Sequence, residues 1–212
     1  MKCSHQFSHY QDSLNKAFEN GYHFLMLKQF KQIENYQKVI LLRHDVDLLL
    51  KNALIMAKIE NEMKIKATYF IQVSGKYNLM FYPNFKLVNS IAELGHEIGL
   101  HYSLDIPQMI NVDTVGYFLR EKRIVEDTLG QKISGICLHD PNSRNKINID
   151  LDKYDLEYDA YSDTIVSQLH YISDSRASWR EGCMCKNIGK HPKLYILTHP
   201  FWWYEKSSCE NY

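Results

Sequence analysis

Two aspartates, Asp45 and Asp47, follow an apolar run and are separated by one residue. The run, residues 38–42, is typical of a buried strand, and on a strand of period two both carboxylates point to the same side. Two carboxylates this close repel each other, and burying them is costly unless a cation or a shared proton offsets the charge. The spacing therefore favours a metal ion at this strand end. In a structural alternative, Asp47 caps the helix expected at 48–63 and Asp45 is a solvated loop residue.

Three histidines occupy comparable positions, each directly after an apolar segment: His101, His139 and His199. In parallel β/α folds the carboxyl ends of all strands lie on one face, so residues far apart in the sequence meet there. A single histidine at a strand end is more often a hydrogen-bonded loop residue than a ligand. Four polar strand ends in register, one with the aspartates and three with histidines, favour a shared site.

Aspartate and histidine together suit zinc or a similar first-row ion, which in catalytic sites binds three protein ligands and one water. The pKa of such a water falls to about 7, so hydroxide becomes available near neutral pH. A nearby carboxylate can take the proton of the water, and a histidine on the opposite side can protonate a leaving group. The combination of residues predicts a metal-dependent hydrolase.

The elements that would position these residues alternate between strands and helices. Helices are expected at 48–63, 82–94 and 112–129, and glycines follow the last two. Seven strands are expected, at 38–42, 67–71, 96–101, 133–138, 159–162, 169–173 and 194–198. This alternation is typical of a parallel α/β sheet, and seven strands fit a distorted, incomplete (β/α) barrel better than an eightfold one.

The chain of 212 residues is long enough for one sizeable domain, and no linker or repeat interrupts it. Residues 1–37 are expected to form an N-terminal helical cap of that domain, and 38–212 to form the barrel. Apolar positions at mixed helical spacing over 7–30 predict a helix or a helical pair there. The segment 174–192, rich in Ser, Arg, Gly, Cys and Lys, is expected to be a long loop.

Charge and hydropathy narrow the class of partner. Lys+Arg and Asp+Glu are equal, at 25 each, so no electrostatic footprint for nucleic acid or for an anionic membrane is present. No apolar run approaches the roughly 18 residues of a transmembrane segment, and the amino terminus lacks the apolar core of a signal peptide. We therefore expect a cytoplasmic protein whose partner is a neutral or small molecule.

The five cysteines show no framework spacing, and their odd number agrees with a reducing compartment. Cys183 and Cys185 form a lone C-x-C, whereas a zinc site needs a second pair. Cys3, Cys137 and Cys209 are scattered along the chain and do not supply one. A structural zinc site is therefore not expected from the sequence.

Four segments combine an apolar stretch with the polar residues described above. They are Arg43-His44-Asp45-Val46-Asp47, Gly95-His96-Glu97-Ile98-Gly99-Leu100-His101, Leu138-His139-Asp140-Pro141 and Leu194–His199. In this order they resemble the first, second, third and fifth motifs of the polysaccharide deacetylase family, the NodB homology domain. The second segment is the most specific match, and the first has a variant spacing of one residue between its aspartates. The motifs span about 38–203.

This resemblance implies a distorted (β/α) barrel that removes an acyl group, such as acetyl, from an N-acylated sugar with the help of one divalent ion, most suitably Zn²⁺. It implies that Asp45 is the general base, and that Asp47 and His101 bind the metal. It also implies that His199 is the general acid that protonates the departing amine. Leu197, in the same final strand, would line the acyl pocket.

The chain departs from the family pattern at two positions. The second metal histidine of the family lies four residues after the first, where this chain has Asp105. The third motif of the family carries an arginine that orients the base, and the matching residue here is His139. Asp105 can supply an oxygen ligand, and His139 can either orient Asp45 or act as the missing nitrogen ligand. The metal ligands are therefore expected to be Asp47, His101 and one of this pair.

Further segments, at 172–176, 179–182 and 198–203, resemble a subgroup of short deacetylase-like proteins associated with the biosynthesis of bacterial surface polysaccharides such as lipopolysaccharide. This resemblance implies that the substrate is a small molecule or oligosaccharide carrying an N-acyl sugar. An aromatic platform with a few convergent polar groups suits a sugar. The residues that would shape this end of the site are Asp174, Arg176, Trp179, Arg180 and Trp202. In a structural alternative, Trp202 and Trp203 only seal the barrel against the N-terminal helix.

Two other functions remain open from the sequence. A catalytically degenerate barrel could bind glycan or a partner protein, and the replacement of a ligand histidine by Asp105 is its best support. A glycosidase could instead use two carboxylates, Asp45 with Asp105 or Asp140, at a separation of roughly 5 to 9.5 Å and without a metal. Sensitivity to a chelator would distinguish the glycosidase from the deacetylase.

Overall fold

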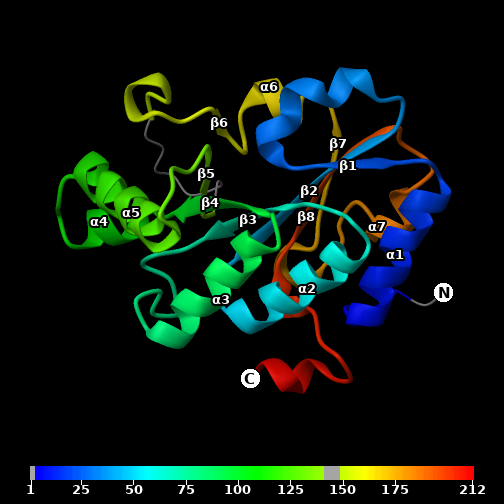
Figure 1. Ribbon diagram of the computed structural model, residues 1–212, viewed down its shortest axis with the longest axis horizontal. Helices are drawn as coiled ribbons and strands as arrows, with labels where there is room; N and C mark the ends of the chain where they lie inside the picture. The colour runs from blue at the N-terminus through cyan, green and yellow to red at the C-terminus, as the bar shows by residue number, and fades with distance from the viewer. Residues whose placement is uncertain (1–2, 141–148) are drawn as a thin grey trace.

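The computed structural model describes residues 3–140 and 149–212, and its centre is one curled sheet of parallel strands (Figure 1). The strand order is β6-β5-β4-β3-β2-β8-β7, and β1 pairs separately with β2. The strands are β1 His23–Leu25, β2 Val39–Val46, β3 Thr68–Ile71, β4 Glu97–Tyr102, β5 Gly135–Leu138, β6 Tyr158–Asp159, β7 His170–Ser173 and β8 Lys193–Thr198. The seven predicted strands are confirmed, and the incomplete barrel is the predicted fold.

β2 lies in the middle of the sheet, between β3 and β8. Every one of its residues is buried, as expected for a parallel strand covered on both faces. Alternate residues point to opposite faces. Val39 and Leu41 belong to the apolar cluster inside the barrel, whereas Ile40 and Leu42 belong to the cluster under the outer helices. The same alternation continues along the strand and places the next odd-numbered residues, beginning with Arg43, on the inner face.

The helices cover the outer face of the sheet. They are α1 Phe7–Glu19, α2 Leu50–Glu62, α3 Tyr82–Glu93, α4 Asp105–Met109, α5 Thr114–Leu129, α6 Asp163–Val166 and α7 Met184–Asn187. Figure 1 shows α2 and α3 side by side, with α1 next to α2 and α5 next to α3. The three predicted helices are therefore confirmed as α2, α3 and α5. None of the helices in the described part of the chain is long and apolar enough to cross a membrane.

Three local expectations differ from the structure. The segment 174–192, expected to be a long loop, contains α7. The N-cap of α2 is Leu49 and no side chain caps this helix, so the alternative role of Asp47 as a helix cap is wrong. The stretch 7–30 is not one helix or a helical pair, because α1 is followed by β1 and then by the 3₁₀ segment Leu27–Asn35. β1 has only three residues, too few for a period-two pattern to be visible in the sequence.

The 3₁₀ segment closes the end of the barrel opposite the polar strand ends. Leu27 and Ile33 are buried in the same cluster as Leu41 inside the barrel. The backbone N–H of Leu27 donates to Thr68 Oγ1 over 2.8 Å, which fixes the segment to β3. With this end filled by apolar side chains, the carboxyl ends of the strands are left as the place for a polar site.

Candidate metal centre and catalytic site

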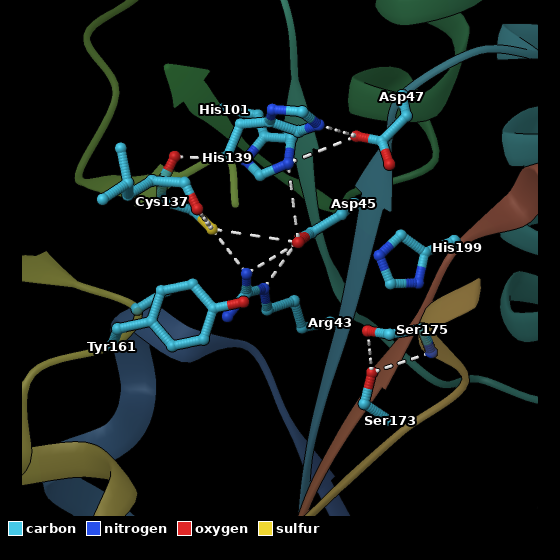
Figure 2. Close-up of polar contacts among 12 residues, drawn as sticks. Arg43, Asp45, Asp47, His101, Cys137, His139, Tyr161, Ser173, Ser175 and His199 are labelled. Atoms are coloured by element: carbon cyan, nitrogen blue, oxygen red, sulfur yellow. Dashed lines mark hydrogen bonds and ion pairs between the residues drawn. The ribbon is translucent and has the colours of Figure 1, made fainter. Parts of the chain in front are cut away.

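Asp47, His101 and His139 lie together where β2, β4 and β5 end (Figure 2). Each offers one donor atom, and these atoms lie within 4.8 Å of one another. His101 Nε2 is 3.2 Å from Asp47 Oδ1, and His139 Nε2 is 4.0 Å from the same oxygen. Side chains from three separate strand ends, 38 to 92 residues apart in the sequence, thus form one group.

The contacts of the two ring nitrogens of His101 show whether this group suits a cation. His101 Nδ1 lies 3.1 Å from the backbone oxygen of Cys137, an acceptor, so Nδ1 carries a hydrogen. The other nitrogen, Nε2, faces Asp47 Oδ1 at 3.2 Å and Asp45 Oδ2 at 3.6 Å. A proton on Nε2, or a metal ion in its place, would offset the charge of these two carboxylates. Two imidazole nitrogens and one carboxylate, with a carbonyl orienting the first ring, fit a catalytic zinc site.

The charge states of the other two donors agree with metal binding. Burial raises the pKa of Asp47, but the hydrogen bond and charge of His101 outweigh burial, so the pKa lies below its usual value and the carboxylate is ionised. Burial lowers the pKa of His139, and the charge of His101 lowers it further. His139 is therefore neutral at neutral pH, which is the form that binds metals.

Asp105 does not belong to this group. It is exposed at the first residue of α4, where its backbone N–H donates to Ser103 Oγ over 3.3 Å. Of the two residues that the sequence left open as the third ligand, His139 is the one placed beside Asp47 among the described residues.

Asp45 lies beside the group and forms a buried ion pair with Arg43. Arg43 Nε donates to Asp45 Oδ1 and Arg43 Nη2 donates to Oδ2, each over 2.7 Å. Tyr195 Oη accepts from Arg43 Nη1 over 2.9 Å, and the ring centroid of Tyr161 lies 4.4 Å from the guanidinium carbon. Arg43 is fully buried, so it acts only through Asp45 and its other neighbours.

Sequence reasoning missed Arg43, although a signal for it exists. It is two residues before Asp45 on a strand, so both side chains point into the barrel. Sequence analysis considered His139 for the task of orienting Asp45, but the two hydrogen bonds of Arg43 already fix this carboxylate. Burial raises the pKa of Asp45, but the charges of Arg43 and His101 outweigh burial and hold the pKa well below its usual range.

His199 faces the opposite side of Asp45, as Figure 2 shows. Its Nδ1 lies 2.6 Å from Asp174 Oδ1, and its backbone N–H donates to the same carboxylate. The remaining Asp174 oxygen accepts from Trp203 Nε1 over 2.9 Å. Burial lowers the pKa of His199, but the hydrogen bond and charge of Asp174 outweigh it and raise the pKa to about 9. His199 is therefore protonated at neutral pH.

A cavity of about 450 Å³ opens over these residues. Its lining consists of the following: Asp45, Asp47, His101, His139, Asp140, Tyr161, Tyr171, Ser173, Ser175, Arg176, Ser178, Arg180, Glu181, His199 and Trp202. Aromatic rings and both signs of charge are thus available to a polar ligand. Asp140 and Arg176 have φ values of 50° and 59°, a conformation that non-glycine residues rarely adopt and that often marks functional sites.

The expected substrate residues differ in their placement. Arg180 and Trp202 line the cavity, whereas Leu197 and Asp174 are buried in the fold and do not line it. Both oxygens of the Asp174 carboxylate accept hydrogen bonds, one from His199 and the other from Trp203. Trp203 is also buried, and its ring packs edge-on against Tyr10 of α1 at 5.1 Å between centroids. The sealing role considered for both tryptophans therefore fits Trp203, and Trp202 faces the cavity.

The remaining motif histidines lie behind the site in a buried network around Glu60. His44 Nε2 lies 2.8 Å from Glu60 Oε1, and Tyr69 Oη donates to Oε2 over 2.8 Å. His96 Nδ1 approaches Oε2 at 3.5 Å, and Tyr10 of α1 donates to Oε1. These histidines therefore have a structural environment, separate from the metal group. Of the third motif, Pro141 lies outside the described residues.

Comparison with known proteins gives a likeness at the level of structure. No protein-family model and no curated protein matches the chain. A mutant of BA3943, described as a CE4 family pseudoenzyme with restored enzymatic activity, aligns with a TM-score of 0.54 and 16% identity, over 77% of this chain and 57% of that one. This chain thus spans little more than half of that structure.

Two further structures have similar scores. Wild-type BA3943 from Bacillus anthracis, described as a CE4 family pseudoenzyme, aligns with a TM-score of 0.51 and 16% identity, over 77% of this chain and 55% of that one. The peptidoglycan deacetylase PdaC from Bacillus subtilis aligns with a TM-score of 0.51 and 18% identity, over 82% of this chain and 80% of that one. The chain therefore has the distorted (β/α) barrel fold of the CE4 polysaccharide deacetylases.

Proposed function

We propose that the protein is a metal-dependent hydrolase that removes an acyl group, most simply acetyl, from an N-acylated sugar. The observation that carries the proposal is the arrangement around Asp45. A potential metal group, Asp47 with His101 and His139, lies on one side of this ionised carboxylate, and the protonated His199 lies on the other. An amide hydrolysis needs these three functions on one substrate carbonyl: an electrophile, a proton acceptor and a proton donor.

The chain supplies the proton acceptor and donor in defined states. Asp45 takes the proton of the attacking water, and Arg43 keeps this carboxylate ionised and fixed in one orientation. His199 holds its Nδ1 hydrogen toward Asp174, so its Nε2 hydrogen is free to protonate the departing amine. Asp47, His101 and His139 would hold a divalent ion, which would supply the Lewis acidity that polarises a carbonyl group and makes water more acidic.

The cavity supports a sugar substrate. Trp202 offers an apolar ring face, and Arg180 and the serines beside it offer hydrogen bonds, a combination suited to a saccharide. We assign Asp174 a positioning role under His199 in place of a direct contact with the substrate. Leu197 lies in β8 next to Arg43 of β2 and acts through packing below the cavity.

The proposal is tested by zinc content and acetate release with N-acetylated sugars and nucleotide sugars. His101→Ala and His139→Ala are each expected to lower bound zinc by one ion per chain and to abolish acetate release. The control Asp105→Ala is expected to keep both, because this residue is exposed and outside the group. Loss of zinc in Asp105→Ala but not in His139→Ala would contradict the assignment of the third ligand.

Catalysis and metal binding are separated by His199→Ala. This variant is expected to keep its zinc and to lose about 10²- to 10⁴-fold in kcat, the usual contribution of a general acid. Unchanged kcat in a folded variant would contradict the role of His199.

A binding protein without catalysis is the second candidate, because one of the similar structures is described as a pseudoenzyme. The same assays decide between the two. Glycan binding without acetate release, in protein that has bound zinc, would favour the second candidate. The glycosidase considered from the sequence pairs Asp45 with Asp105 or Asp140. Asp45 lacks the raised pKa that the acid of such a pair needs, and Asp105 does not line the cavity. For the pair with Asp140, activity that survives a chelator would favour the glycosidase.

The cellular role follows from the sequence resemblance alone. We propose that the substrate is an intermediate of bacterial surface-polysaccharide biosynthesis, such as that of lipopolysaccharide, and that the reaction takes place in the cytoplasm. Acetate release from a nucleotide-linked or lipid-linked N-acetyl sugar, in preference to a polymer, would support this placement.

A further inference from the structure

A second group of potential metal ligands lies away from the cavity, between the N-terminal segment and α7. It consists of Cys3, His9, Cys183 and Cys185, whose four donor atoms all lie within 4.8 Å of one another. Cys3 Sγ is 3.6 Å from Cys185 Sγ, and His9 Nε2 is 3.3 Å from Cys183 Sγ. None of the four lines the cavity of the candidate active site.

The separations match those around a tetrahedral ion. With zinc–sulfur bonds of about 2.3 Å, two thiolates of one tetrahedron lie about 3.8 Å apart, and a sulfur and an imidazole nitrogen lie about 3.6 Å apart. The two printed contacts are within about half an ångström of these values. Three sulfurs and one nitrogen are a ligand set of closed, structural zinc sites, and soft thiolate ligands select zinc over magnesium or calcium.

We propose that Cys3, His9, Cys183 and Cys185 bind a structural zinc ion. On binding, the three thiols release their protons to solvent and the neutral imidazole coordinates through Nε2, so the complex carries one net negative charge. A cation lies close by, since Lys16 Nζ donates to the backbone oxygen of Cys185. His9 and Cys183 are buried and the other two ligands are half-buried, so the site is largely shielded from solvent.

The position of the site indicates what the ion stabilises. Cys183 and Cys185 follow the loop that carries Arg180 and Glu181 into the cavity wall. Cys3 precedes α1, and His9 lies in the first turn of this helix. A zinc ion would fix this loop to α1 across 174 or more residues of chain and restrict the unfolded state in the same way as other long-range cross-links.

Aromatic packing continues from this site toward the active site. His5 stacks on Trp179 at 6.3 Å between ring centroids, and it meets the edge of Trp203 at 5.2 Å. Trp203 in turn donates to the Asp174 carboxylate under His199. The zinc ion is therefore placed to hold the wall of the cavity, independently of what the cavity binds.

The sequence did not predict this site because only half of the ligands form a recognisable pair. Cys183 and Cys185 have metal-ligand spacing, but the partner ligands are a single cysteine and a single histidine near the opposite end of the chain. Their proximity depends on the packing of α1 beside α7, which the fold creates and no local pattern encodes.

Cobalt substitution of the full chain tests the proposal directly. Co²⁺ added to metal-free, reduced wild-type protein is expected to give a thiolate-to-cobalt charge-transfer band in the near ultraviolet and the intense visible bands of a tetrahedral site. The bands are expected to persist in His101→Ala, which removes a ligand of the other group. They are expected to disappear in the double variant Cys183→Ser with Cys185→Ser, and the exposed Cys209→Ser serves as the matched control.

Zinc analysis of protein purified under reducing conditions completes the test. The double variant is expected to contain one zinc ion fewer per chain than Cys209→Ser, and a mercurial reagent is expected to release that ion from the wild type. The proposal is overturned if the wild type shows no charge-transfer band with Co²⁺. It is also overturned if mass analysis of protein purified with zinc finds Cys3 and Cys185 joined as a disulfide. Failure of either test leaves the deacetylase proposal untouched, because that depends on acetate release.

Discussion

At the scale of single residues, the state of His199 depends on its partner Asp174. This carboxylate is buried and accepts hydrogen bonds from both the ring and the backbone of His199, so it favours the imidazolium form. The raised pKa of His199, about 9, stabilises the folded protein. This contribution is fully present below the ordinary histidine pKa of 6.5 and is lost as the pH rises through 9.

Asp174→Asn is expected to lower the pKa of His199 by about 1 to 3 units, because the substitution removes the negative charge beside the ring. NMR titration of the His199 ring measures this change without a substrate. In acetate-release assays, the alkaline fall of kcat is expected to move to lower pH by the same amount. Ser175→Ala, a change in the cavity wall, is the control and should leave the titration unchanged. An unaltered His199 titration in Asp174→Asn would contradict the positioning role.

Arg43 shows the cost of leaving a buried charge without a partner. Arg43→Ala is expected to lower the free energy of unfolding by about 3–5 kcal/mol, since it leaves Asp45 buried without its two hydrogen bonds. Urea denaturation at pH 7 measures the change. The control Arg123→Ala removes an ion pair with Asp127 whose side chains are 82% and 72% exposed, and its expected effect is within about 0.5 kcal/mol. Equal small effects in both variants would argue against a tight Arg43–Asp45 pair.

At the scale of elements, the strands were predictable because buried parallel strands are continuous apolar runs. Their polar ends identified Asp45, Asp47 and the three histidines, which the structure brings to one cavity. The hydrogen-bond partners of these side chains were not predictable. Strand parity places Arg43 on the inner face, but only the folded sheet shows that it binds Asp45 and that Asp174 lies under His199.

The position of Asp105 illustrates the same limit. Counting four residues from His101 identifies it, but β4 ends at Tyr102 and a new short helix begins at Asp105. The side chain of Asp105 therefore does not reach the metal group, although its spacing from His101 matches the family pattern. His139, from the end of the neighbouring strand, lies there instead.

Gly99 in β4 shows how closely neighbouring elements approach. A Cβ atom at this position would lie 2.5 Å from the Phe70 ring and 2.8 Å from the backbone oxygen of Gly135. Gly99→Ala is expected to lower the free energy of unfolding by about 1–3 kcal/mol through overpacking, as measured by urea denaturation. Combined with Phe70→Leu, it should lose less than the sum of the single changes, because the smaller side chain relieves part of the clash. Strict additivity would contradict this explanation.

At the scale of the whole molecule, the fold alone does not determine activity. The similar structures include a peptidoglycan deacetylase and a pseudoenzyme on the same barrel. What a particular chain does depends on side chains at the strand ends and on the segments that hold them. Here the N-terminal part of the chain supports the site from behind. Tyr10 of α1 donates to Glu60, and His5 stacks on Trp179, the residue before Arg180 of the cavity wall.

The network around Glu60 connects α1 and α2 with the strands β2 and β3 and with His96, just before β4. We therefore expect it to contribute to the free energy of unfolding of the whole domain. Burial raises the pKa of Glu60, but the charge of His44 and its hydrogen bonds outweigh burial and lower the pKa. A lowered pKa contributes stability that is present above the ordinary value of 4.5 and is lost as the pH falls through the folded-state pKa.

Glu60→Gln is therefore expected to lower the free energy of unfolding by about 1–3 kcal/mol at pH 7, where it removes charge-assisted hydrogen bonds. The deficit relative to the wild type should shrink as the pH is lowered below 4.5, because the wild type then loses the same contribution. Urea denaturation of both proteins between pH 3 and pH 7 measures this difference. Glu157→Gln, an exposed glutamate, is the control and should follow the wild type. A deficit that stays constant with pH would show that Glu60 acts through shape and not through its charge.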